Sequence, residues 1–444
     1  MKNFCAFIFS MLFFVSCQGY VVVSNPDDPS FGQESPGSER ELTLVVYLAA
    51  DNNLESAALE DMNEMEAAIC NPLVTVLALI DRSPGYDTSD GNWSGTRLYE
   101  IVHDADGMNR TLCSKRIHCP VLGVYANRET ELDMGSETTL CGILSFAKNM
   151  YPARQYGLVM WGHGTGWRSG FESSVSAEKQ NAVRAFAIDD TSHSYLALSK
   201  LRNAIDQSME GTKLLFIGFD TCFGFEFEVA YELRNCALWL CGCEGTEANS
   251  GWNYKQWFDS FLHTVPDGKE ICMMVSQQFS CSADWSFGIA DLSKIENAFI
   301  CFDRFAQLCS SCVSTKTDLQ KLHGCFNLAQ SFCVSGIESD LYVNVCSLTE
   351  CLMQAFPLVK ENGLNTLYAL QNCLTSFNDG KHFALGVYVC DIDANGNRLL
   401  LPQNAYTKGT DAENQCSFVR DSAGYVPTVS GLSTLLDKLF NTEI

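Results

Sequence analysis

Short apolar runs alternate with helical segments along the first part of the chain, and this alternation limits the possible folds most strongly. Five runs are apolar at nearly every position, as strands buried on both faces are: residues 42–50, 73–80, 156–161, 213–219 and 237–243. Helical patterns separate them at residues 54–69, 138–150, 196–209 and 225–235. This order predicts an open α/β fold with a mainly parallel central sheet and right-handed crossovers.

The pattern changes after residue 264. Helices are predicted at residues 269–280, 292–309, 319–332, 347–356, 364–377 and 431–441, and one late strand at residues 383–390. We therefore expect an α/β core over residues 42–264 and a mostly helical C-terminal region, with a late strand, over residues 265–444.

The N-terminus has the features of an export signal. Lys2 precedes an apolar run over residues 4–15, which is too short to span a bilayer, and Ser16 and Cys17 follow it. Residues 14–17 resemble the lipobox of bacterial lipoproteins, so we expect residues 1–17 to be a lipoprotein-type signal peptide and Cys17 to carry the lipid. Ordinary cleavage and secretion is the alternative. Residues 18–41 are polar and rich in turn formers, and we expect a flexible tether there. We expect no transmembrane helix in the mature chain.

The charge balance excludes one class of partner. The chain has 53 acidic and 29 basic residues, a formal net charge of −24, and would repel phosphate backbones. We therefore expect no binding to nucleic acid. The excess suits basic substrates, but it is equally compatible with any soluble acidic protein.

Reactive residues follow two of the predicted strands. His163 stands between two glycines after the run 156–161, and Cys222 follows the run 213–219 with Asp220 and Thr221 before it. Ligands of parallel sheets bind outside the carboxyl ends of the strands. We expect a helix to begin near Phe223, which would favour the Cys222 thiolate, while a nearby histidine accepts the proton. Structural roles for this histidine and this thiol are the alternative.

These motifs resemble those of a known family. Trp161-Gly162-His163-Gly164 and Asp220-Thr221-Cys222, followed by Tyr231-Glu232-Leu233, are similar to the histidine and cysteine blocks of the clostripain family. That family comprises cysteine endopeptidases of the caspase–gingipain–legumain superfamily. Residues 46–54, 189–191, 251–254 and 386–389 resemble further blocks of the family, so the likeness covers roughly residues 42–440. It implies a caspase-like α/β/α sandwich.

The resemblance also implies roles for single residues. His163 would be the general base and Cys222 the nucleophile, with the backbone N–H groups of Gly164 and Cys222 as the oxyanion hole. Asp220 would lie in the primary specificity pocket and select a substrate Arg or Lys. The alternative for Asp220 is a cap on the helix that follows. Phe223 and residues 242–243 and 248–249 depart from the family pattern near the expected pocket.

Activation and metal binding are further expectations from the resemblance. Family members are often cleaved in the loop between the two blocks, here residues 165–184, and Lys179 and Arg184 are the candidate self-cleavage sites. A solvated surface loop is the alternative. The chemistry requires no cofactor, but calcium dependence is known in the family. Asp189 and Asp190 offer carboxylates, without the spacing of a calcium-binding loop.

Cysteine is unusually frequent, with 22 residues. Setting aside Cys5, Cys17 and Cys222 leaves an odd number, so they cannot all pair within one chain. Cys309, Cys312 and Cys325 lack a usual zinc spacing, and a disulfide or buried thiols are favoured there.

The sequence thus predicts an exported, lipid-anchored cysteine endopeptidase, monomeric, acting on proteins or peptides after Arg or Lys. The alternative is an inactive surface lipoprotein that uses the same fold to bind a protein partner.

Overall fold

A computed structural model describes residues 40–167, 186–261, 263–279, 287–332, 339–375, 383, 385–392 and 431–441, all within one compact unit. The signal peptide with Cys17, the tether up to residue 39, and the segment with Lys179 and Arg184 lie outside these residues. Within the described ranges, no helix combines the length and apolar character that crossing a bilayer requires.

The central sheet has eight strands in the order β10-β9-β8-β5-β1-β2-β3-β4. Its parallel strands are β1 (Arg40–Ala50), β2 (Val74–Arg82), β5 (Ala153–Gly162), β8 (Leu214–Asp220) and β9 (Ala237–Cys243). These strands match the five apolar runs to within a few residues, which confirms a mainly parallel sheet. β1 begins at Arg40, so residues 40 and 41 belong to the sheet and not to the expected tether.

Three strands at the margins of the sheet were not expected. They are the antiparallel strands β3 (Gly95–Glu100), β4 (Lys115–Arg116) and β10 (Phe287–Asp291). A separate two-stranded sheet pairs β6 (Phe186–Asp189) with β7 (Ser194–Leu196). All five are short, so their sequences carry no long apolar run.

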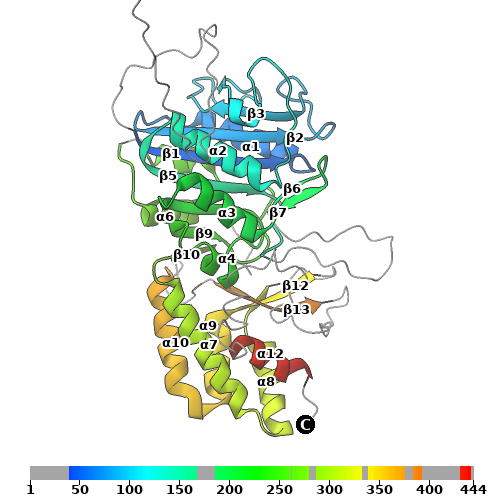
Figure 1. Ribbon diagram of the computed structural model, residues 1–444, viewed down its shortest axis with the longest axis vertical. Helices are drawn as coiled ribbons and strands as arrows, with labels where there is room; N and C mark the ends of the chain where they lie inside the picture. Colours follow the sequence, from blue (N-terminus) through cyan, green and yellow to red (C-terminus); the bar gives the residue numbers. More distant parts are fainter. Residues whose placement is uncertain are drawn as a thin grey trace, which may run out of the picture. The chain divides into compact units, whose positions relative to one another are not determined.

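Helices cover both faces of the central sheet (Figure 1). Alternate residues of β1 point to opposite faces, so Val45 and Tyr47 belong to one core cluster and Leu44 and Val46 to the other. The helices α2 (Glu137–Met150), α3 (Leu198–Met209) and α4 (Phe227–Glu232) contribute to the first cluster, and α1 (Glu55–Ala67), α5 (Tyr254–Asp259) and α6 (Gly268–Gln278) to the second. A 3₁₀ turn, η1 (Pro120–Leu122), packs near α2. The fold is therefore a three-layer α/β/α sandwich, as expected.

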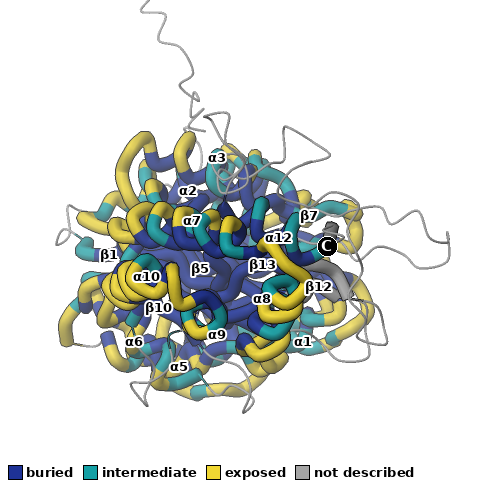
Figure 2. Tube along the Cα trace, turned by 90° about the horizontal axis from the view of Figure 1, so that it is seen from below, coloured by how far each residue is buried: buried dark blue, intermediate teal, exposed yellow. Residues whose placement is uncertain are grey.

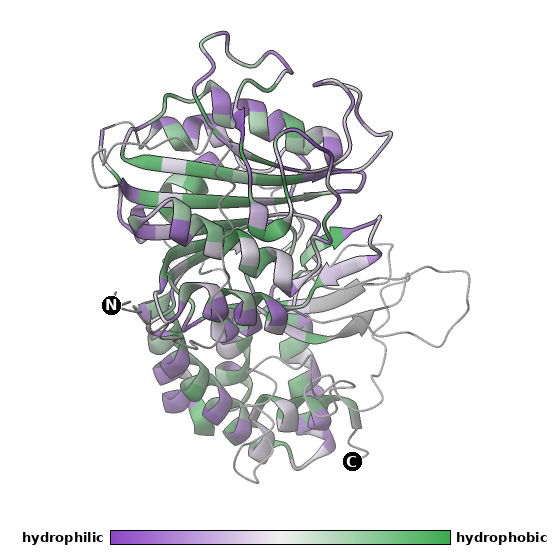
Figure 3. Ribbon diagram, turned by 45° about the horizontal axis from the view of Figure 1, so that its top comes forward, coloured by the Kyte–Doolittle hydropathy of each residue, from purple (hydrophilic) through white to green (hydrophobic). Residues whose placement is uncertain are grey.

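Burial and hydropathy follow this layering. The strands at the centre of the sheet, such as β5, are buried, whereas the helices expose one side (Figure 2). The strands are accordingly mostly hydrophobic, and the helices mix hydrophobic and hydrophilic positions (Figure 3).

The C-terminal region is mostly helical, as expected. Its elements are α7 (Ile295–Cys312), α8 (Lys316–Leu328), α9 (Val345–Ala355), η2 (Pro357–Val359), α10 (Lys360–Cys373) and α12 (Gly431–Asn441). Helix α7 packs against both α10 and α12, and α8 against α9. An antiparallel sheet, β11-β12-β13, consists of β11 (Ser331–Phe332), β12 (Ser339–Asn344) and β13 (Gly386–Ile392). The helix expected at 319–332 ends at Leu328 because Ala329 is extended and Phe332 pairs with Tyr342.

Two buried glutamates of the α/β core, Glu228 and Glu244, accept hydrogen bonds from this small sheet and from the residue directly before β13. The Glu244 carboxylate accepts from the Asn344 side chain and from the Leu385 backbone N–H. The Glu228 carboxylate accepts from the Tyr388 N–H at 3.0 Å. Both glutamates are fully buried, so these donors replace the water that the carboxylates lose on folding.

Candidate active site

The strand order brings the two reactive motifs to the same edge of the sheet. Strands β5 and β8 are parallel neighbours, and Trp161 is paired with Asp220, so His163 and Cys222 each lie two residues beyond one paired position. A Cβ placed on Gly164 would overlap the Cys222 carbonyl oxygen and lie 2.7 Å from Thr221 Oγ1. The two segments are therefore in backbone contact, and only glycine fits at position 164.

Cys222 is not at the start of a helix, and that expectation is wrong. Helix α4 begins only at Phe227. The chain after Cys222 turns through Phe223, which has a left-handed φ of 52°, and is extended at Glu226, directly before α4. Backbone N–H groups of Phe223 and Phe225 donate to the carbonyls of Gly245 and Cys243 at 2.7 and 3.0 Å. Hydrogen bonds to the end of β9 and to the segment that follows it thus replace the first helical turn.

The ionisation of the Cys222 thiol therefore depends on the groups that surround its sulfur atom. Burial raises the pKa of Cys222, the Glu247 backbone N–H that donates to Sγ at 3.2 Å opposes this, and the charge of Asp220 adds to the increase. No helix dipole lowers the pKa of this thiol, so forming a thiolate requires a nearby base.

His163 is held by an asparagine that the sequence analysis did not single out. Its Nε2 lies 2.7 Å from Asn53 Oδ1. An amide oxygen only accepts, so Nε2 carries the proton and Nδ1 keeps its lone pair. Burial lowers the pKa of His163, and the charge of Asp190 opposes this. The imidazole is therefore neutral near pH 7, as a general base must be.

Asn53 belongs to a turn directly after β1 that is fixed from two sides. The Asn52 side chain donates to the carbonyls of Ala49 and Ile188, both at 3.0 Å. The Asp190 N–H donates to the Asp51 carbonyl at 2.9 Å. A systematic search of residues that follow parallel strands would have included Asn53, because β1 is the neighbour of β5.

Asp220 is buried and does not cap a helix, so that alternative is wrong. Its Oδ2 accepts from the Tyr254 hydroxyl at 2.7 Å and from the Trp252 N–H at 3.4 Å. Burial raises the pKa of Asp220 to about 7, although these two donors oppose the increase. Gly251 has a φ of 53°, and a Cβ there would lie 2.9 Å from Asp220 Oδ1, so glycine leaves space beside the carboxylate.

Two further carboxyl groups interact with Asp220. Asp61 on α1 accepts from Trp161 Nε1 at 2.7 Å. Both carboxylate oxygens of Glu247 are buried, and the structure as described places no hydrogen-bond donor beside them. Burial, followed by the charge of Asp220, raises the pKa values of Asp61 and Glu247 well above their usual range. Within the described part of the chain, none of these three carboxyl groups has a Lys or Arg partner. The arrangement suits a cation that comes from outside the chain.

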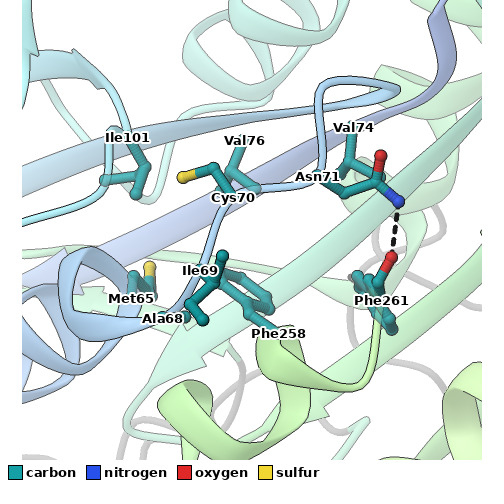
Figure 4. A pocket seen from close by; sticks show the side chains of 10 residues that line it. All are labelled: Met65, Ala68, Ile69, Cys70, Asn71, Val74, Val76, Ile101, Phe258 and Phe261. Atoms are coloured by element: carbon teal, nitrogen blue, oxygen red, sulfur yellow. Dashed lines mark hydrogen bonds between the residues drawn. The ribbon is translucent and has the colours of Figure 1, made fainter. Parts of the chain in front are cut away.

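A separate apolar pocket does not belong to this site. It is lined by residues from the end of α1, the start of β2 and the segment 258–261 (Figure 4). Strand β2 begins here at Val74, so the pocket lies at the amino end of that strand and not at the carboxyl ends. It therefore lies away from the sheet edge that carries His163 and Cys222.

Other expected site features have the following positions. Gly164 forms an isolated antiparallel bridge with Phe186, and its oxyanion role stays a prediction. Lys179, Arg184 and Cys17 lie outside the described residues. All 16 cysteines whose state the structure gives are free thiols, including Cys309, Cys312 and Cys325.

Comparisons with known proteins agree with the sequence motifs. The model of the clostripain family matches residues 46–420. A curated relative, clostripain of Hathewaya histolytica, is 28% identical over 216 residues, which cover 46% of this chain and 38% of that protein. The match thus spans well under half of the relative's length.

Two solved structures share the fold. An inactive zymogen C11 protease from Parabacteroides distasonis superposes with a TM-score of 0.57 at 16% identity, covering 80% of this chain and 93% of that one. A secreted C11 cysteine protease from Bacteroides thetaiotaomicron, in complex with an irreversible peptide inhibitor, gives 0.52 at 16% identity, covering 89% and 99%. These likenesses confirm the caspase-like fold class.

Proposed function

Since this chain belongs to the clostripain family, we propose that it is a cysteine endopeptidase with His163 and Cys222 as its catalytic pair. The observation that carries the proposal is the contact of Gly164 with the Cys222 backbone, next to a neutral His163 that Asn53 orients. A base and a thiol on neighbouring strand ends are the two groups that acyl transfer needs.

The proposed reaction has two steps. In the first, His163 accepts the Cys222 proton and the thiolate attacks the scissile carbonyl carbon. The carbon–nitrogen bond breaks, His163 protonates the leaving amine, and a thioester remains on Cys222. In the second, water attacks the thioester while His163 accepts a proton. The carbon–sulfur bond breaks, which releases the acid and restores the thiol. The N–H groups of Gly164 and Cys222 would stabilise the oxyanion in both steps.

We further propose that the enzyme cleaves after Arg or Lys. The support is the buried group of Asp220, Asp61 and Glu247, whose mutual repulsion a substrate cation would relieve. A guanidinium or ammonium group placed there would form charge-assisted hydrogen bonds, and the Glu247 oxygens without donors are available to it.

Export, anchoring and activation complete the proposal. The N-terminal sequence supports export with a lipid on Cys17, and the relative from Bacteroides thetaiotaomicron is described as secreted. We propose self-cleavage after Lys179 or Arg184, and a monomeric enzyme that acts on proteins or peptides. Mass spectrometry of the mature N-terminus tests the anchor, because an unmodified start elsewhere than Cys17 contradicts it.

A peptide assay tests the activity and its specificity. Peptides that differ only in the P1 residue, Arg, Lys, Gln or Asp, are incubated with the wild type, Cys222→Ala and His163→Ala. We expect cleavage after Arg and Lys by the wild type alone. No cleavage by any form under reducing conditions with calcium would contradict the peptidase and favour the inactive binding protein. Asp220→Asn then tests the pocket: we expect a loss of roughly 100-fold or more in kcat/KM for P1 Arg, because a buried charge pair is broken.

A further inference from the structure

A second group of carboxylates lies beside the turn that carries Asn53. One oxygen each of Asp51, Asp81 and Glu131 lies within 4.8 Å of the other two. The strand register explains the contact, because Ala49 pairs with Asp81 across β1 and β2, and Asp51 follows two residues later. Glu131 comes from the segment before α2, and its Oε2 lies next to Gly95.

Two of these carboxylates have an oxygen without a donor, although both are buried. Asp51 Oδ2 accepts from the Thr191 N–H and Asp81 Oδ1 from the Thr96 hydroxyl, each at 2.8 Å. Among the described residues, Asp51 Oδ1 and Asp81 Oδ2 have no hydrogen-bond partner, and the two residues are only 1% and 0% exposed. A buried oxygen left unsatisfied is costly, so a structure that keeps two of them together requires an explanation.

The surroundings of this group are acidic. Burial, then the charge of Glu131, raises the pKa of Asp81 to about 9, and burial with the charges of Asp51 and Asp189 raises the pKa of Glu131 to about 7. Asp189 has both oxygens bonded to backbone N–H groups, of Ser192 and Met134, and is fixed in place. The negative charges of these carboxylates lie close together, and a cation between them would offset their repulsion.

A second acidic group in the chain serves as a contrast. Glu66, Asp104 and Cys113 are equally close to one another. However, both Glu66 oxygens accept backbone N–H groups, and both Asp104 oxygens accept donors from Asp106 and Asn109. That group is satisfied by the protein itself and provides no oxygen that lacks a partner.

We propose that Asp51, Asp81 and Glu131 bind one calcium ion. Calcium takes six to eight oxygen ligands in an adaptable geometry, whereas magnesium usually has one or two carboxylates and keeps its water. Three carboxylates, one of them exposed and adjustable, therefore favour calcium, with water completing the shell. The family resemblance implies calcium without naming residues. Of the two aspartates expected from the sequence, Asp189 acts on Asp81 through its charge, and Asp190 contacts Asp51 through its backbone N–H.

The ion would act on the candidate active site through the backbone. The Asp51 backbone carbonyl accepts a hydrogen bond from the Asp190 N–H, and the Asp51 carboxylate accepts one from the Thr191 N–H. Asn53, which holds His163, is two residues further on. Binding at Asp51 would fix this turn, and Asp51 would then be a positioning residue that never touches the substrate.

The test uses the purified full-length chain with Cys222→Ala, so that it does not depend on peptidase activity. After removal of metal by a chelator, calcium is titrated in by calorimetry and thermal melts are recorded. We expect saturable binding of one ion at or below about 1 mM, the weakest range of extracellular calcium sites, and a melting temperature that rises with calcium. Magnesium at the same concentration should have a smaller effect.

Two variants locate the site, with one matched control. Asp81→Asn should weaken calcium binding at least tenfold and remove the thermal shift. Glu131→Gln, at an exposed position that folding tolerates, should weaken it similarly. Asp104→Asn, in the satisfied group, should bind calcium like the parent. Absence of saturable binding up to about 10 mM, or wild-type affinity in Glu131→Gln and Asp81→Asn, overturns the proposal.

Discussion

The hydrogen bond from His163 to Asn53 predicts a specific kinetic defect. In the resting enzyme, Nε2–H donates to the Asn53 amide oxygen at 2.7 Å, a neutral bond that contributes about 0.5–1.5 kcal/mol. When His163 takes the thiol proton, the same bond has a charged donor and contributes about 1.5–3 kcal/mol. Only the charged state occurs in the transition state, so the bond is stronger there than in the ground state.

Asn53→Ala should therefore lower kcat and leave KM nearly unchanged. The free variant enzyme lacks the neutral bond as well, so only the difference between the charged and the neutral bond, about 1–1.5 kcal/mol, is lost from the transition state, a decrease of roughly 5- to 13-fold in kcat/KM. Steady-state kinetics with a P1 Arg peptide measures both constants. Asn109→Ala, which removes side-chain hydrogen bonds to Asp104 and to the Thr111 N–H but touches neither His163 nor Cys222, serves as the control and should behave like the wild type.

Asn53→Asp separates positioning from a general loss of structure. A carboxylate at this position raises the pKa of His163, since an opposite charge favours the imidazolium. The acidic limb of the pH–rate profile should move up by roughly one unit, while activity at high pH is retained. The reasoning is refuted if Asn53→Ala stays within about twofold of the wild type, or if Asn53→Asp leaves the acidic limb unmoved.

Three further predictions concern stability and the site's backbone. Glu55→Gln breaks a buried ion pair with Arg82, whose atoms are 2.7 Å apart, and should cost about 3–5 kcal/mol in urea unfolding, whereas the double change Glu55→Gln with Arg82→Met should recover much of it. An unchanged midpoint in the single variant would contradict the burial argument. Gly164→Ala should abolish peptide cleavage, because its Cβ overlaps the backbone of Cys222, whereas Gly324→Ala, with open space on a helix, should be neutral or stabilising by up to about 1 kcal/mol. With calcium removed by a chelator, the free energy of unfolding should fall as the pH rises from about 4 to about 9. The reason is that carboxyl groups whose pKa is raised by folding, such as Asp81, bind protons more tightly in the folded chain than in the unfolded chain. Thermal melts that show stability rising over this range contradict the prediction.

The sequence predicts the parts of the fold whose signals are local. Strands such as β8 are buried on both faces and appear as continuous apolar runs, and Gly431–Asn441 matches its predicted helix. Strand β10 pairs along its length with β9 and has only an isolated bridge, from Ala290 to Leu374, on its other side; it was missed because a strand at the edge of a sheet needs no such run. The helix expected at Phe223 failed because long-range pairing with Gly245 competes with local helix formation.

The site shows the same division. His163, Cys222 and Asp220 stand out because each follows a recognisable strand. Asp81 lies within a strand, 30 residues from Asp51, and only the register of β1 and β2 reveals that they meet. The lack of hydrogen-bond donors around the Glu247 carboxylate likewise follows from how that group is buried, which a sequence pattern does not reveal.

The adjacency of β5 and β8 has a consequence for chain integrity. The two strands that carry His163 and Cys222 are joined by their own ladder of backbone hydrogen bonds, from Gly157 paired with Phe216 to Trp161 paired with Asp220. Cleavage of the chain anywhere between Trp167 and Phe186 would therefore leave the two fragments held together by hydrogen bonds within one sheet. Such a nicked molecule should migrate as two bands under denaturing conditions and as a single species in its native state.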